Sequence, residues 1–130
     1  MRTLAFDGYG TLIDTNGVLV LLEKIVGKKA KAFSQTWRDK QLEYSFRRAH
    51  MQNYVCFEVC KLQALEYCCL FYKTKLNDEE KNELMVIYAI LPSFDDVKDS
   101  LIELKEKGFR LFAFSNGKAV AVEKLLTNAG

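Results

Sequence analysis

Apolar residues are distributed along the chain in two short runs and several longer segments with helical spacing. The runs cover residues 3–6 and 109–114, and each is nearly continuous, as expected of a short buried strand. In the longer segments, apolar residues recur three and four positions apart, which is typical of amphipathic helices. Helices are therefore expected over residues 17–27, 28–49, 54–73, 78–90, 93–108 and 118–128.

The order of these elements predicts an α/β fold, because the helices separate the two strands in the sequence. Strands connected through helices form parallel sheets with right-handed crossovers. We expect a partial Rossmann-like core from residues 1–15 and 92–130, with residues 16–91 inserted in it as a helical cap. Ser93 is expected to be the N-cap of the helix that follows Pro92. The strand over 109–114 is expected to be covered on both faces.

Composition and charge exclude several classes of protein. Hydrophobic residues make up 49% of the 130 residues, which is too many for a disordered chain. Nineteen basic and seventeen acidic residues leave a net charge of +2, without the basic excess of a nucleic-acid binder. There is no apolar run of about 18 residues, so no membrane span is expected. The N-terminus does not read as a signal peptide, and a cytoplasmic location is expected.

All four cysteines fall in the segment expected to be the third helix: Cys56, Cys60, Cys68 and Cys69. This spacing is not that of a disulfide framework, and a single histidine, His50, does not complete a zinc site. We expect free buried thiols, as in a reducing compartment. A metal- or redox-responsive cluster is the alternative.

Polar and glycine residues follow both predicted strands. The first strand leads into 7–11, read D-G-Y-G-T, and the second leads into 115–117, read S-N-G. In open parallel sheets, the loops at the carboxyl ends of the strands form the ligand-binding crevice. These two loops are therefore the candidate site.

These motifs resemble those of the haloacid dehalogenase superfamily. Residues 6–12, F-D-G-Y-G-T-L, and 114–117, F-S-N-G, are similar to its first and second motifs. Tyr9 stands where the phosphatase branch has a second aspartate, as in the type II (S)-2-haloacid dehalogenases, which work without a metal. Residues 37–44, W-R-D-K-Q-L-E-Y, resemble that family's W-R-x-K-Q-L-E-Y stretch. The resemblance covers the whole chain.

The resemblance implies hydrolytic dehalogenation of short-chain (S)-2-haloalkanoic acids to 2-hydroxy acids, with inversion and through an aspartyl ester. Asp7 would be the nucleophile, and Thr11 would hydrogen-bond it. Arg38 and Asn116 would hold the departing halide. The substrate carboxylate would be held by Ser115 and by the backbone N–H groups after Asp7, including that of Gly8. The apolar part of the substrate would lie in a pocket formed by Tyr9, Leu42 and Phe57.

The resemblance also implies the partners. The substrate would be a small 2-haloacid, no cofactor or metal is implied, and the chain would form a homodimer through its cap helices. The segment over 54–73 is apolar on several sides, as expected of a helix that is buried or at an oligomer interface.

The sequence also departs from the family pattern. The family's lysine and later acidic strand-end motif lie beyond the position matched by Gly130, so a truncated chain is expected. Asp39 replaces a glutamine common beside the arginine, which is expected to put a negative charge near the halide. Two alternatives stay open: a phosphatase-like member, which Tyr9 disfavours, and a non-catalytic remnant that binds small carboxylates or a partner.

Overall fold

A computed structural model describes residues 1–130. The chain folds into two compact units. The strand unit is formed by Met1–Gly17 and Ala89–Gly130, and the helical unit is Val18–Tyr88.

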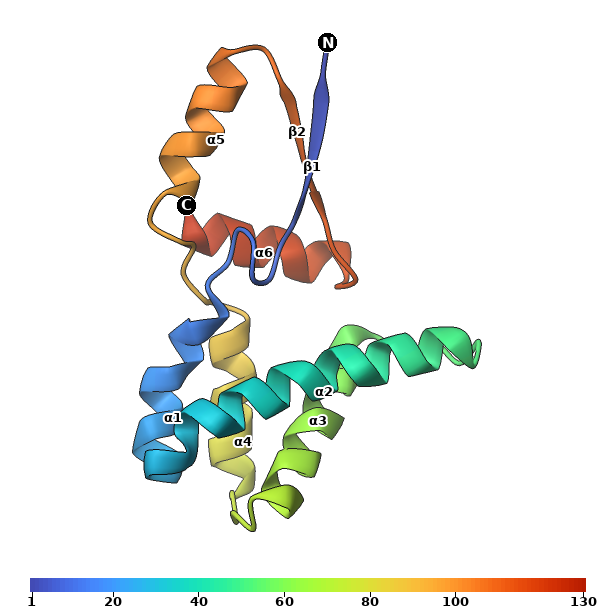
Figure 1. Cartoon of the computed structure of the whole chain (residues 1–130), viewed down its shortest axis with the longest axis vertical. Coiled ribbons are helices and arrows are strands. Elements are labelled where there is room, and N and C mark those ends of the chain that lie inside the picture. The colour runs from blue at the N-terminus through green and yellow to red at the C-terminus, as the bar shows by residue number, and fades with distance from the viewer. The chain divides into compact units, whose positions relative to one another are not determined.

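The strand unit is built on a parallel pair of strands (Figure 1). Strands β1 (Thr3–Asp7) and β2 (Arg110–Phe114) pair in a register that runs from Thr3 opposite Arg110 to Asp7 opposite Phe114. Helix α5 (Val97–Glu106) precedes β2 and contacts it, and α6 (Ala119–Ala129) follows it. Gly108, with a φ of +84°, lies in the turn between α5 and β2, where the left-handed backbone favours glycine. The predicted α/β fold with a parallel sheet is confirmed.

Three local predictions for this unit are wrong. Strand β1 is not a buried strand, since Leu4 and Phe6 are half-buried and its other residues are exposed. Strand β2 is not covered on both faces: Phe112 is 49% exposed and Phe114 is 73% exposed, because the sheet has only two strands and few elements to cover it. Ser93 is not the N-cap of α5, since that position belongs to Asp96 and α5 starts at Val97. Ser93 instead forms an isolated antiparallel bridge with Ile13, which fixes its backbone outside the helix.

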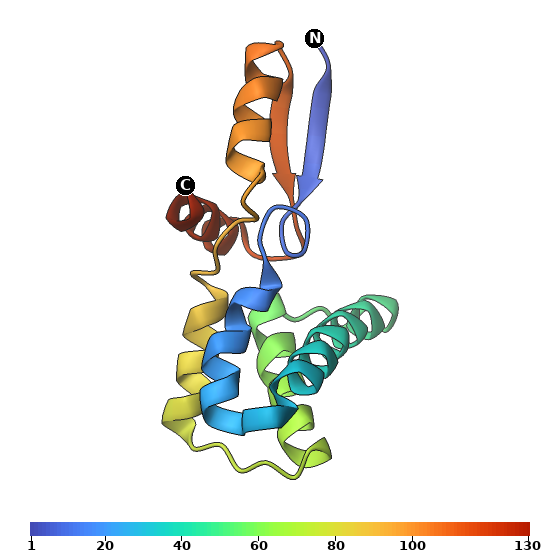
Figure 2. The ribbon, with the colours of Figure 1, turned by 60° about the vertical axis from the view of Figure 1, so that its left-hand side comes forward.

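The helical unit contains four α-helices (Figure 2). They are α1 (Leu19–Val26), α2 (Ala30–His50), α3 (Phe57–Phe71) and α4 (Asp78–Tyr88), with a short 3₁₀ turn at Gly27–Lys29. A second 3₁₀ turn, Thr15–Val18, spans the end of the first strand-unit segment and the start of the helical unit. Gly27, with a φ of +68°, ends α1, and the Asn77 side chain accepts a hydrogen bond of 2.7 Å from the Glu80 N–H at the start of α4. Helix α2 packs along α3 and also contacts α1.

The core of the helical unit is aromatic and aliphatic. Trp37 is fully buried, and its ring meets that of Tyr88 edge to face at 4.8 Å. Cys60 and Cys68 are buried, Cys56 and Cys69 are half-buried, and all four are free thiols. None of the helices combines the length and the apolar composition that a bilayer crossing demands.

Two segments of the strand unit run side by side: one precedes the helical unit in the sequence, and the other follows it. The Asp14 N–H donates to the Pro92 carbonyl at 2.9 Å, and the Phe94 N–H donates to the Leu12 carbonyl at 3.2 Å. Gly17 lies against the same segment: a Cβ atom added there would be 2.9 Å from Pro92 Cδ. The residues that lead into the helical unit are thus fastened to those that lead out of it.

Candidate active site

The loop after β1 is a tight turn that holds its polar residues at the strand end. The Gly8 carbonyl accepts N–H groups from Thr11, Leu12 and Ile13 at 3.3, 2.9 and 3.0 Å. Gly10 has a φ of +84°, a left-handed conformation that glycine adopts without steric cost. Gly8 is buried and Tyr9 half-buried, whereas Asp7, the last residue of β1, is exposed.

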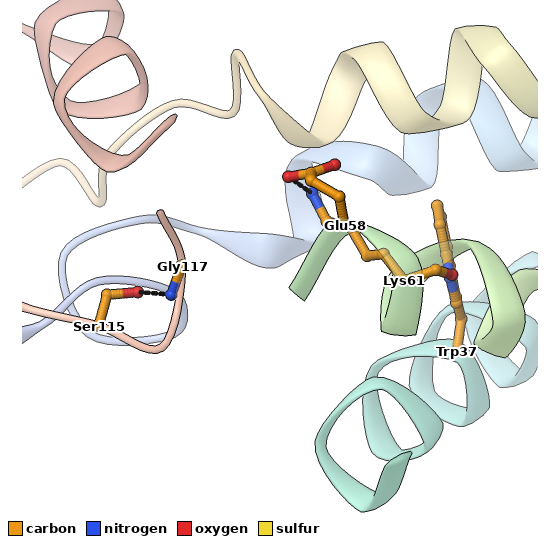
Figure 3. Close-up of polar contacts among 5 residues, drawn as sticks. All are labelled: Trp37, Glu58, Lys61, Ser115 and Gly117. Atoms are coloured by element: carbon orange, nitrogen blue, oxygen red, sulfur yellow. Dashed lines mark hydrogen bonds and ion pairs between the residues drawn. The ribbon is translucent and has the colours of Figure 1, made fainter. Parts of the chain in front are cut away.

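The loop after β2 leads directly into a helix. The Ser115 Oγ accepts a hydrogen bond of 3.1 Å from the Gly117 N–H, a contact drawn in Figure 3. A Cβ atom at Gly117 would be 3.2 Å from a Val122 methyl group, so glycine allows the close approach to α6. Lys118 is the extended residue before α6, so the N–H groups of the first turn of α6 follow Ser115 and Asn116 closely in the sequence.

The strand pairing brings the two loops to one edge of the sheet. Asp7 is the register partner of Phe114, so the residue after each strand leaves the same end of the pair. Asp7 therefore lies beside the loop that carries Ser115 and Asn116. This edge presents a carboxylate, a hydroxyl, an amide and a helix N-terminus, which together can attack an electrophilic carbon and bind an anion.

The helical unit carries the remaining predicted site residues. Arg38 and Leu42 are four positions apart on α2 and share one side of that helix. The Arg38 Nη1 atom is buried, and Leu42 is half-buried. Phe57 is the first residue of α3 and is buried. The helical unit thus carries one cation, Arg38, and two apolar side chains, Leu42 and Phe57, of the predicted site residues.

The other charged residues of the 37–44 stretch have partners on α2. Lys40 Nζ lies 2.6 Å from a Glu43 carboxylate oxygen, and the other oxygen is 2.6 Å from Arg47. The hydrogen bond raises the pKa of Lys40 and lowers the pKa of Glu43. Asp39 is exposed, and its carboxylate accepts a hydrogen bond of 2.9 Å from Gln35. Each of these side chains has a partner on α2 itself.

We did not predict from the sequence that several polar residues of the helical unit are buried, among them Gln41, Lys61 and Tyr88. Gln41 lies four positions after Trp37, so it occupies the buried stripe of α2, where an amide is unusual. That position in the helical pattern could have revealed it. The sequence offers no comparable signal for Lys61, whose burial depends on how α2, α3 and α4 pack.

An apolar cavity in the strand unit is separate from the strand ends. Its volume is about 520 Å³, and its lining includes Phe6, Leu101, Leu111 and Leu126. Asp7, Ser115 and Asn116 do not line it. No three His, Cys, Asp or Glu side chains come together as a set of metal ligands.

Known proteins are similar to this chain in sequence. An (S)-2-haloacid dehalogenase of Pseudomonas sp. (strain YL) is 34% identical over 130 residues, and one of Pseudomonas putida is 36% identical over 129 residues. These matches cover 100% and 99% of this chain but 56% and 57% of the relatives. The haloacetate dehalogenase H-2 of Moraxella sp. (strain B) is 35% identical over the whole chain and 58% of its own length.

Solved structures agree with these relatives. A crystal structure of an L-2-haloacid dehalogenase superposes with a TM-score of 0.95 at 32% identity, over 100% of this chain and 59% of that one. The L-2-haloacid dehalogenase of Xanthobacter autotrophicus with chloropropionic acid covalently bound gives a TM-score of 0.90 at 29% identity, over 100% of this chain and 52% of that one. The fold is therefore that of these dehalogenases, of which the chain spans a little over half the length.

The family assignment rests on the whole chain. The sequence profile of the haloacid dehalogenase-like hydrolases matches residues 1–130. Both strand-end loops and the 37–44 stretch lie within this match. The chain therefore belongs to the haloacid dehalogenase-like hydrolases.

Proposed function

We propose that this chain carries the carbon–halide-cleaving residues of an (S)-2-haloacid dehalogenase. The observation that carries the proposal is the strand pairing, which sets the Asp7 carboxylate beside the loop with Ser115 and Asn116. Two of the relatives described above are named for this activity, and the L-2-haloacid dehalogenase of Xanthobacter autotrophicus has a structure with chloropropionic acid covalently bound. A carboxylate nucleophile at a strand end fits such an adduct.

The first step forms an ester on Asp7. A carboxylate oxygen forms a bond to C2 of the 2-haloacid while the carbon–halide bond breaks, and the halide leaves with the bonding electron pair. Attack opposite to the leaving group inverts C2. Negative charge grows on the halide, so Arg38 and Asn116 are placed here as the cation and the N–H donor that stabilise it.

The second step hydrolyses this ester. Water attacks the acyl carbon of Asp7, the bond from that carbon to the ester oxygen on C2 breaks, and the 2-hydroxy acid leaves with its inverted centre intact. One proton is released, and Asp7 regains its carboxylate with one oxygen from the water. The hydroxyl oxygen of the product is therefore an original Asp7 oxygen.

The other residues of the set bind and orient the substrate. Ser115, the N–H groups that follow Asp7 from Gly8 onward, and the N-terminus of α6 would hold the substrate carboxylate. Thr11 would hydrogen-bond the nucleophile. Tyr9, Leu42 and Phe57 would form apolar walls that exclude water during the displacement. No metal is required, since Tyr9 has no carboxylate with which to hold one beside Asp7.

We also propose a domain arrangement and an assembly. Residues 1–15 and 92–130 act as the core and residues 16–91 as the cap. The chain associates into a homodimer through the cap, since Leu70 and Phe71 on α3 are 81% and 61% exposed. Large apolar side chains grouped on one surface are typical of protein interfaces.

Intact-mass spectrometry in water enriched in oxygen-18 tests the proposed reaction. The chain is incubated with (S)-2-chloropropionate, and halide release is followed in parallel. An ester that persists adds one carboxyethyl group to the chain, and an ester that is hydrolysed leaves an oxygen-18 atom in the peptide containing Asp7. Either product supports the proposal.

The matched control is Asp7→Asn, which keeps the size of the side chain and removes the nucleophilic carboxylate. It should show no adduct, no isotope and no halide. (R)-2-chloropropionate should give none of these products with the parent chain. Halide release without a change in the mass of Asp7 would contradict the ester mechanism, and no product at all would favour a carboxylate-binding remnant.

A further inference from the structure

One end of the helical unit collects lysines from two segments that are far apart in the sequence (Figures 1 and 2). Residues 24–31, where α1 passes into α2, hold four lysines, and residues 72–77, between α3 and α4, hold two. All six lysines are exposed, and neither segment contains an acidic residue. We call this group the lysine surface, and its members are Lys24, Lys28, Lys29, Lys31, Lys73 and Lys75.

Tyr72 holds the two segments together. Its hydroxyl donates a hydrogen bond of 3.1 Å to the Ala32 carbonyl and lies 2.7 Å from the Thr36 hydroxyl. Its ring lies against that of Phe33, with the centroids 5.6 Å apart. In the other direction, Lys29 Nζ donates a hydrogen bond of 3.2 Å to the Tyr72 carbonyl. Direct contacts within the helical unit therefore keep the lysines of both segments at one surface.

The positive charge of the lysine surface is not neutralised by ion pairs. No carboxylate oxygen lies within 4.0 Å of any of the six ammonium groups. The adjoining acidic residues are Glu23 and the run over 78–80, which opens α4 and complements the positive end of that helix. Because the whole chain has a net charge of only +2, six unpaired lysines at one end of a unit are an uneven distribution of charge.

Lys73 occupies a backbone position where glycine is the usual residue. Helix α3 ends with hydrogen bonds from the Lys73 N–H to the Leu70 carbonyl, at 3.3 Å, and from the Thr74 N–H to the Cys69 carbonyl, at 2.9 Å. Lys73 has a φ of +51°, a left-handed conformation that glycine adopts with less strain. The chain thus carries a cation where backbone geometry favours glycine. The carbonyl ends of α1 and α3 stabilise positive charge nearby, so the fold can sustain it.

We propose that the lysine surface binds an anionic membrane surface, one that contains acidic phospholipids. Clusters of four to eight basic residues are attracted to acidic headgroups, and each lysine near the surface strengthens binding about fivefold. All six cations are lysines, so the planar fork with which arginine recognises single phosphates and bases is absent. Lysine ammonium groups instead respond to the spread charge of a lipid surface. None of the residues placed in the proposed reaction takes part in this binding.

Co-sedimentation of the whole chain with lipid vesicles tests the proposal. One set of vesicles is phosphatidylcholine with about 30% phosphatidylserine, and the other is phosphatidylcholine alone. At about 0.1 M salt the parent chain should sediment with the acidic vesicles and not with the neutral ones. About 0.5 M salt should release it, because ions screen exposed charges.

Two double variants locate the binding surface. Lys31→Gln with Lys75→Gln removes one cation from each segment and should weaken binding to acidic vesicles about 25-fold, which is about fivefold for each lysine. The matched control is Lys105→Gln with Lys124→Gln, which makes the same change in net charge at exposed lysines of α5 and α6. This control should weaken binding less than about threefold. Far-UV circular dichroism checks that both variants are folded.

Three outcomes would overturn the proposal. Equal losses for the two double variants would show that binding follows net charge and not the lysine surface. Equal sedimentation with neutral and acidic vesicles would show that headgroup charge is not what the chain recognises. A parent chain that stays off acidic vesicles and binds a single-stranded RNA homopolymer would assign the surface to nucleic acid instead.

Discussion

The indole N–H of Trp37 donates a hydrogen bond of 2.9 Å to the backbone carbonyl of Lys61, and this bond ties α2 to α3. Trp37 is fully buried and also contacts Tyr88 on α4. One side chain thus joins three helices of the helical unit through one polar and one aromatic contact.

Trp37→Phe should therefore destabilise the helical unit. The substitution removes the N–H donor and leaves a void, which together should cost about 2–4 kcal/mol of unfolding free energy. Urea unfolding followed by far-UV circular dichroism measures this loss, since the variant has no tryptophan to report. Tyr54→Phe, at an exposed position, should change the midpoint little. Equal midpoints for Trp37→Phe and the parent would contradict the role of this contact.

The buried thiol of Cys68 should make stability fall in alkaline solution. Burial raises the pKa of Cys68 from 9.0 to about 12, so the unfolded chain loses this proton at a lower pH than the folded chain does. The free energy of unfolding that the buried neutral thiol contributes is fully present below pH 9 and is lost as the pH rises from 9 to about 12. The expected slope is about 1 kcal/mol per pH unit.

Urea midpoints measured at several pH values in this interval check the prediction. Cys68→Ala should flatten the dependence, whereas Cys56→Ala, at a half-buried position, should keep it. Parallel curves for the parent and Cys68→Ala would show that this thiol does not carry the effect.

The exposed end of α3 should mediate self-association. Leu70 and Phe71 are largely exposed, and Phe71 stacks on Tyr67 at 5.7 Å, so the end of α3 presents an apolar surface. Leu70→Arg should shift sedimentation of the chain towards the monomer at micromolar concentration. Val20→Arg, at another exposed apolar residue on a different helix, is the control. A monomeric parent chain would contradict the proposed dimer.

Halide release should not depend on a divalent metal. Tyr9 provides no second carboxylate beside Asp7, so a chelator should leave the initial rate unchanged within about twofold. The measurement is halide release from (S)-2-chloropropionate with and without EDTA. Activity that disappears with EDTA and returns with magnesium would refute this.

Gly17→Ala should destabilise the strand unit. The added Cβ would lie 2.9 Å from Pro92 Cδ and 3.0 Å from Leu91 Cδ2, so the chain must shift, at a cost of about 1–3 kcal/mol. Thermal unfolding measures the loss. Gly8→Ala is the control, because no atom lies within 4 Å of its added Cβ and the unfolded chain loses the same flexibility. A larger loss for Gly8→Ala than for Gly17→Ala would contradict the steric argument.

The sequence was a good guide where local chemistry decides the structure. The helical spacing of apolar residues located all the α-helices. Gly27 marked the end of α1, because helices commonly end at a glycine with a positive φ. The candidate loops were found because Asp7 and Ser115 follow apolar runs directly. The assigned chemical roles of these residues stay predictions.

Contacts between segments far apart in the sequence could not be predicted in this way. An apolar run does not reveal how many elements cover it, so the exposure of Phe114 was not anticipated. Ser93 has the residue type of an N-cap, but its bridge to Ile13 depends on a segment far away in the sequence. The ring contact between Trp37 and Tyr88 brings together residues of two helices, and no local pattern records that contact.

The bridge between Ile13 and Ser93 also has a topological consequence. The chain departs for the helical unit just after one bridge partner and returns just before the other. A short glycine–serine linker from Gly17 to Ala89 could therefore close the strand unit on itself, with the intervening residues excised. An insertion whose two ends lie close together in this way is a module. Evolution or an engineer can exchange it for another without changing the path of the chain in the strand unit.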